Sequence, residues 1–134
     1  MNDTNGNLVL KNLAFTNITV KREFKLSNNV ELDGTFDINY DEVSEDEINV
    51  ILTYNAKSKK NDIFIEVELQ GNFCIYGDVE KDVKKYLLHI NSIAIMFPYL
   101  RSQVSIATTQ PGFVPIQIPI VNAIALARAA GFKD

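Results

Sequence analysis

The distribution of proline is the feature of this sequence that most limits its fold. Pro98, Pro111, Pro115 and Pro119 all lie in the C-terminal half, and the first 77 residues contain no proline. Proline cannot donate a hydrogen bond to a strand ladder, so a proline-free half is free to build a central sheet. Inside a helix, proline removes a backbone donor and costs roughly 3 kcal/mol. We therefore expect a sheet from the first half and interrupted helices from the second.

Apolar and polar residues alternate through four stretches of the first half. The segment VELDGTFDINY is a clear case, and the other rows begin near Leu8, Ile48 and Ile63. Alternation with period two predicts strands that have one buried and one solvated face. The first row slips near Lys11–Asn12, and Gln70–Gly71 interrupts the last, which predicts a bulge or bend at the glycine. The acidic segment DEVSEDE predicts a solvated hairpin tip.

The period becomes helical after Gly77. The first helical face is formed by Val83, Tyr86, Leu87 and Ile90, and the second by Phe97, Leu100, Val104 and Ala107. We expect the first helix to end near Asn91–Ser92. Pro98 then belongs in the first turn of a second helix, where its missing donor has no partner to lose. The segment TQPGF ends this helix, and Asn122 and Gly131 predict the N-cap and the end of a short final helix.

Strands followed by helices predict an α+β fold. We expect a four-stranded antiparallel sheet with two or three C-terminal helices packed on one face. The whole chain, residues 1–134, has the length of a single domain, with strands over about 8–77 and helices over about 79–131.

Charge and apolar run length exclude several classes of protein. Thirteen basic and seventeen acidic residues give a net charge of −4, which argues against nucleic acid as a partner. The N-terminus lacks the pattern of a secretory signal, and the run IAIMFPYL is too short to span a bilayer. We expect a cytoplasmic protein with no membrane insertion. The single cysteine, Cys74, agrees with a reducing compartment.

The residues of the chain do not form a catalytic pattern. His89 and Cys74 are each the single residue of their type, so no Cys/His metal site with several ligands can form within one chain. There is no glycine-rich phosphate loop. His89 is flanked by Leu88 and Ile90, which indicates a structural role. We therefore expect no enzyme and no cofactor.

The second helix carries another stripe, formed by Tyr99, Gln103, Ile106 and Gln110. One interpretation is a polar outer face with a stray isoleucine; the other is a contact between subunits. Arg101 is the one charged residue between Asn91 and Ala127. A stretch with so few charges is suited to a contact between subunits.

An ordered set of residues in the second half resembles the SecB family of bacterial export chaperones. The residues that carry the resemblance are Phe73, Gly77, Phe97–Tyr99, Arg101, Gly112–Phe113, Pro115 and Val121–Asn122. They cover roughly Ile63 to Leu126. Their order is a strand ending in glycine, a short helix, FPY.R opening a long helix, GF.P, and VN opening the last helix.

The resemblance implies a chaperone that holds unfolded preproteins without ATP and assembles as a homotetramer, a dimer of dimers. It implies that Phe24, Leu26, Val30 and Phe113 bind the client chain. It also implies that Tyr99, Gln103 and Ile106 of the long helix form the oligomer interface.

In the family, the translocase motor SecA docks on an acidic face of the sheet. Phe64 and Glu66 match that face here, whereas Asn17 and Lys21 stand where acidic residues are expected. Two alternatives therefore stay open beside a general holdase. One is a dedicated chaperone of a toxin–antitoxin system with an antitoxin-like client, and the other is an oligomeric interaction module without chaperone activity.

Overall fold

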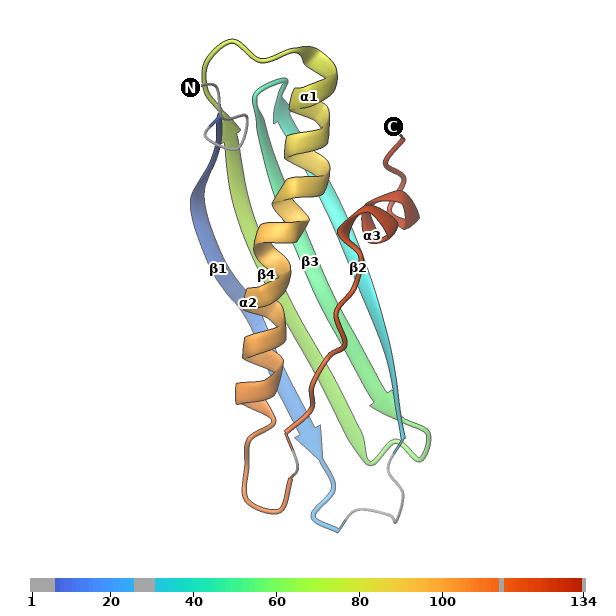
Figure 1. Cartoon of the computed structure of the whole chain (residues 1–134). Coiled ribbons are helices and arrows are strands. Elements are labelled where there is room, and N and C mark those ends of the chain that lie inside the picture. Colours follow the sequence, from blue (N-terminus) through green and yellow to red (C-terminus); the bar gives the residue numbers. More distant parts are fainter. Residues whose placement is uncertain (1–6, 26–30, 114, 134) are drawn as a thin grey trace.

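The computed structural model describes residues 7–25, 31–113 and 115–133 (Figure 1). Four strands come first along the chain and the helices follow, as predicted. The strands are β1 (Leu8–Arg22), β2 (Leu32–Ser44), β3 (Glu47–Ser58) and β4 (Ile63–Ile75). The helical elements are α1 (Lys81–Tyr86), the π-helical turn η2 (Leu87–Asn91), α2 (Ser92–Ala107) and α3 (Ala123–Ala129).

The strands form one antiparallel sheet in the order β1-β4-β3-β2, which confirms the predicted fold class. Tight turns join β2 to β3 and β3 to β4, and the acidic segment forms the first of these turns, at Glu45 and Asp46. β1 lies at one edge and β2 at the other, so the chain passes from edge to edge between them. β1 therefore ends at a corner of the sheet.

β4 continues without interruption through Gln70–Gly71, so the bulge predicted there is wrong. β3 and β4 pair without a shift. The irregularities of the sheet lie on β1, at Lys11 as predicted and at Thr16, and on β2 between Glu42 and Ser44. Gly71 is needed for another reason. A Cβ at this position would lie 2.9 Å from the ring of Phe73 and 3.1 Å from the sulfur of Met96. Glycine lets α2 approach the sheet closely.

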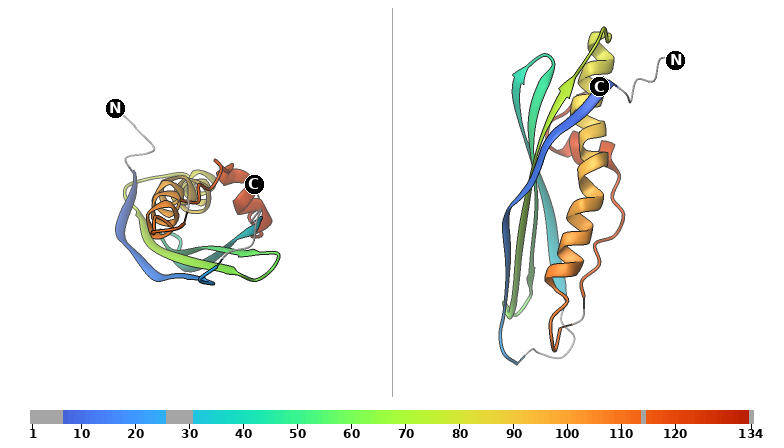
Figure 2. Two further views of the ribbon diagram at one scale, coloured as in Figure 1. Left: turned by 90° about the horizontal axis from the view of Figure 1, so that it is seen from below. Right: turned by 90° about the vertical axis from the view of Figure 1, so that its left-hand side faces the viewer.

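The helices cover one face of the sheet and leave the other open (Figure 2). Along β3 and β4, side chains that point toward the helices are buried and alternate with more exposed ones. The centre of the core consists of Ile48, Val50, Leu52, Ile65, Val67 and Leu69 from the sheet, and of Ile93, Met96, Leu100 and Val104 from α2. Each such side chain contributes roughly 1.5–3 kcal/mol when fully buried.

α1, η2 and α2 form one continuous helical rod along the sheet (Figure 1), so the break predicted near Asn91–Ser92 is wrong. Pro98 lies in the interior of α2 and does not begin a helix. The rod stays intact because Met96, Phe97 and Leu100 around the proline are buried against the sheet. Their burial outweighs the roughly 3 kcal/mol that an interior proline costs.

The Pro98→Ala variant is expected to raise the free energy of unfolding by about 1–3 kcal/mol. Alanine restores the donor for the carbonyl of Ala94, and no core contact is lost because Pro98 is exposed. Urea denaturation followed by far-UV circular dichroism measures the change. An unchanged or lower midpoint would contradict the view that the proline weakens this helix.

The chain after α2 runs back beside the helix as an extended segment, residues 115–121, and then enters α3 (Figure 1). Arg101 of α2 fixes this segment by donating a hydrogen bond of 2.9 Å from Nε to the carbonyl of Ile118. Asn122 caps α3 as predicted, because its side-chain oxygen accepts from two backbone N–H groups of the first turn. Gly131, with φ of 104°, follows the helix, also as predicted.

Candidate functional site

The segment that follows β1 presents an apolar side chain to solvent. Phe24 has 99% of its surface exposed. The backbone just before it is fixed, because the N–H of Glu23 donates to the carbonyl of Asp62 at 2.8 Å. Leu26 and Val30, which were also predicted to bind a client, lie outside the described residues. A large apolar side chain in this position is suited to contact another molecule.

A tight turn after α2 lies at the same end of the sheet (Figures 1 and 2). The N–H of Phe113 donates to the carbonyl of Gln110 at 3.0 Å, with Pro111 and Gly112 between them. Gly112 has φ of 74°, so the order proline then glycine matches a type II turn. Phe113 is half-buried and packs against the core. The turn is therefore anchored by its last residue.

Arg22, the last residue of β1, connects these two segments. Its Nη1 donates to the carbonyl of Gly112 at 2.7 Å and its Nη2 to the carbonyl of Phe24 at 3.1 Å. Its Nε donates to the carbonyl of Glu23 at 3.0 Å. The guanidinium carbon also lies 5.4 Å from the centre of the Phe113 ring, within the range of a cation–π contact. One side chain thus contacts both predicted phenylalanines, Phe24 through its backbone and Phe113 through its ring.

A pocket of about 460 Å³ lies at this junction, lined by Arg22, Glu23, Phe24, Pro111 and Gly112. The sequence interpretation found two residues of the junction, Phe24 and Phe113, but missed Arg22. A signal was present, since Arg22 pairs with Ile63 of β4 and falls on the row that faces the helices. A charged residue in an apolar row needs partners, and three carbonyls supply them.

Three of the four residues predicted to form a stripe on the long helix lie on the accessible surface of α2, whereas Gln110 lies after the end of the helix. Ile106 and Tyr99 are 62% and 51% exposed, and Gln103 is partly exposed. Ile95, one helical turn before Tyr99, is also exposed and extends the stripe, and the sequence interpretation missed it. We call Ile95, Tyr99, Gln103 and Ile106 the α2 stripe. It lies beside the core-facing side of the helix and contains no charge.

The face of the sheet opposite the helices carries the residues assigned to the motor-docking face. Phe64 is 41% exposed on β4. Glu66, on the same face of β4, accepts a hydrogen bond from the Asn17 amide of β1. Lys21 pairs with Phe64 across the strands. The acidic character of this part of the face therefore comes from β4.

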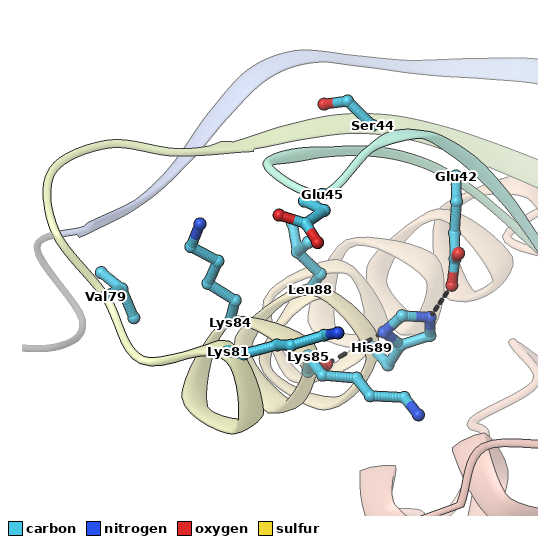
Figure 3. Close-up of a pocket in the computed structure, with 9 residues that line it drawn as sticks. All are labelled: Glu42, Ser44, Glu45, Val79, Lys81, Lys84, Lys85, Leu88 and His89. Carbon is cyan, nitrogen blue, oxygen red and sulfur yellow. Dashed lines mark hydrogen bonds and ion pairs between the residues drawn. The ribbon is translucent and has the colours of Figure 1, made fainter.

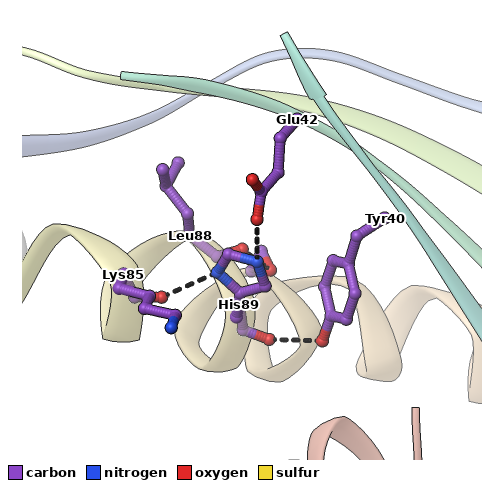
Figure 4. A network of polar contacts seen from close by, with 6 residues as sticks. Tyr40, Glu42, Lys85, Leu88 and His89 are labelled. Carbon is purple, nitrogen blue, oxygen red and sulfur yellow. Dashed lines mark hydrogen bonds and ion pairs between the residues drawn. The ribbon is translucent and has the colours of Figure 1, made fainter. Parts of the chain in front are cut away.

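A second group of polar residues lies near the other end of the rod (Figure 4). His89 contacts the carbonyl of Lys85 through Nδ1 and the carboxylate of Glu42 through Nε2, both at 2.9 Å. Tyr40 donates to the carbonyl of His89 at 2.7 Å, and burial raises the pKa of Tyr40 to about 12. Phe132 packs near the histidine ring at 5.4 Å. These contacts tie η2 to β2 and to the chain after α3, which matches the structural role predicted for His89.

A pocket of about 400 Å³ lies between the first hairpin tip and α1 (Figure 3). Lys81, Lys85 and Glu45 line it together with Lys84, whose ammonium pairs with Asp46 at 2.7 Å. Side chains of both signs border the pocket, so it does not select a ligand by charge. The described residues contain no group of three histidine, cysteine, aspartate or glutamate side chains that could hold a metal ion. Among the described residues, no helix is long and apolar enough to cross a bilayer.

Comparison with known proteins gives a consistent result. The family model described as preprotein translocase subunit SecB matches residues 6–130. The protein-export protein SecB of Orientia tsutsugamushi strain Boryong is 35% identical over 118 residues, 84% of this chain and 73% of its own length. The protein-export protein SecB of Bartonella bacilliformis is 28% identical over 121 residues, 87% of this chain and 76% of its own.

A solved structure shares the fold. The SecB-like chaperone of Mycobacterium tuberculosis, in complex with a peptide from an antitoxin, matches with a TM-score of 0.67 at 12% identity. The match covers 87% of this chain and 91% of that one. By family model, sequence identity and fold, this chain belongs to the SecB family, whose members are non-enzymatic chaperones of protein export.

Proposed function

We propose that this protein is an ATP-independent holdase that binds unfolded or extended polypeptides, among them precursors for export. The observation that carries the proposal is the exposed side chain of Phe24, which borders a pocket that Arg22 and Gly112 also line. At this pocket, Arg22 donates a hydrogen bond to the carbonyl of Gly112. A site that accepts many sequences needs accessible apolar side chains rather than a matched set of charges. Membership of the SecB family supports the same function. The compartment that we propose is the bacterial cytoplasm.

The proposed assembly is a homotetramer that uses the α2 stripe. Tyrosine and isoleucine without neighbouring charges are suited to the centre of a protein interface. Several client sites on one assembly strengthen binding, because the second contact of the same client becomes intramolecular. SecA is a further proposed partner, supported by Phe64 and Glu66 on the open face of the sheet.

A dedicated client is the second candidate. The solved relative from Mycobacterium tuberculosis holds a peptide from an antitoxin on the same fold. An antitoxin-like partner would use the same exposed site but would bind as one defined sequence. Affinities for several unrelated unfolded chains separate the two candidates, because a general holdase should bind them with similar strength.

The central experiment is an aggregation assay without nucleotide. A stoichiometric amount of the protein is expected to delay light scattering by a chemically unfolded client diluted into buffer. A matched amount of an unrelated globular protein is the control. If no delay occurs with any of several clients, the general holdase function is wrong, and a dedicated chaperone or a non-chaperone interaction module remains.

A further inference from the structure

We propose that Arg22 is a positioning residue of the client site. Its guanidinium holds Glu23 and Phe24, directly after β1, and the turn after α2 in a single arrangement, and client affinity depends on that arrangement. This inference rests on the proposed holdase function, but its first test needs no client.

The guanidinium uses one N–H of each nitrogen, three of its five donors, to bind the protein's own backbone. Its three nitrogens donate to the carbonyls of Glu23, Phe24 and Gly112. Two of these carbonyls belong to the segment after β1, and the third belongs to a turn 90 residues further along the chain. A planar group with donors in a fixed fork can reach three carbonyls at once, which the single ammonium of lysine cannot reproduce.

The guanidinium is in turn fixed by the core. Phe113 packs against the buried cluster, and the Arg22 guanidinium lies over its ring. A chain of contacts therefore leads from the core to Phe113, to Arg22 and then to the backbone of Phe24. The exposed ring of Phe24 has no packing of its own, so its position depends on its backbone.

This arrangement affects binding through preorganisation. An unfolded client already loses conformational freedom when it binds, and a site that is ordered beforehand adds no further ordering cost. Three carbonyls and the ring of Phe113 hold the guanidinium in place, so Arg22 acts through Phe24 and Phe113 rather than by pairing with a client carboxylate. Its loss should weaken the binding of acidic and neutral clients equally.

The first test is amide hydrogen exchange on the whole protein without client. In Arg22→Gln, the amides of Glu23 and Phe113, which are hydrogen-bonded, should exchange about tenfold faster. Amides at the centre of β3 should keep their wild-type rates. Lys21→Gln, which removes the same charge one residue earlier, is the matched control and should leave all these rates unchanged. Unchanged rates in Arg22→Gln would overturn the inference.

The second test is client affinity, measured by fluorescence anisotropy with labelled, reduced and carboxymethylated lactalbumin. Arg22→Gln should raise Kd about tenfold, and Lys21→Gln should not change it. Arg22→Lys keeps the charge but should restore little of the lost client affinity. In a Phe24→Ala background, Arg22→Gln should have a much smaller effect, because the residue through which it acts is gone. Equal effects in both backgrounds would mean that Arg22 contacts the client itself.

Two further outcomes are distinguishable. If the wild-type protein binds no client, the holdase function fails, while the exchange experiment still decides whether Arg22 orders the two segments. If Arg22→Gln does not fold, the exchange and affinity measurements are made on Arg22→Lys, which keeps the charge and the aliphatic stem. Wild-type exchange rates and wild-type affinity in Arg22→Lys would then overturn the inference.

Discussion

The Ile106→Asp variant is expected to separate the proposed homotetramer into dimers while each subunit stays folded. Ile106 is 62% exposed on the single chain, so its side chain is not needed by the core. In a symmetric contact one substitution places a carboxylate on both sides, facing apolar surface. An unpaired charge in such a contact costs several kcal/mol, which corresponds to at least a hundredfold in Kd. Light scattering coupled to gel filtration at micromolar concentration measures the mass.

A matched variant on the same helix separates this effect from general disturbance of α2. Ala94 is exposed but lies outside the α2 stripe, so Ala94→Asp should keep the wild-type mass. Both variants should keep the wild-type circular dichroism spectrum. A tetramer that survives Ile106→Asp would mean that the stripe is ordinary surface. A wild-type protein with the mass of one chain would remove the proposed assembly.

The sheet could be predicted because the rule that forms it is local. One face of β3 and β4 is buried, so apolar residues recur at every second position and can be read along the sequence. The slip at Lys11 was visible for the same reason. Gly71 was misinterpreted, since what it allows is the approach of Met96 from a helix that is distant in sequence.

The helical rod was misjudged because local and tertiary preferences compete there. Judged alone, Pro98 belongs at a helix start, but the burial of Met96, Phe97 and Leu100 keeps the chain helical on both sides of it. The π-helical turn η2 shifts the faces of the helix by inserting an extra residue per turn, and a search for period 3.6 does not detect it. Tertiary packing keeps Pro98 inside the helix, and the π-helical turn breaks the period on which the prediction relied.

The candidate site was found in part. Phe24 is an apolar residue in a polar connection, which makes it visible in the sequence. The contacts of Arg22 were not visible, because Gly112 is 90 residues away and is contacted through a backbone carbonyl, which no residue type reveals. The roles assigned to the predicted client, interface and motor-docking residues stay predictions.

The Phe24→Asp variant is expected to lose most of its holding activity, with Kd for an unfolded client raised at least about tenfold. The aromatic ring is 99% exposed, so its removal should leave the melting temperature unchanged and the measurement reports binding alone. In the proposed tetramer every subunit loses the same contact. A client that spans several sites therefore also loses the added affinity that comes from binding them together. The aggregation assay and fluorescence anisotropy measure the two quantities.

Phe64→Asp is the matched control, because it makes the same chemical change on an exposed phenylalanine of the open sheet face. It should hold clients as the wild type does, since Phe64 belongs to β4 and does not line the pocket at Arg22. If Phe64→Asp weakened client binding and Phe24→Asp did not, the client would lie on the open face of the sheet. Because the two positions lie on different surfaces, one pair of variants decides which surface receives the unfolded chain.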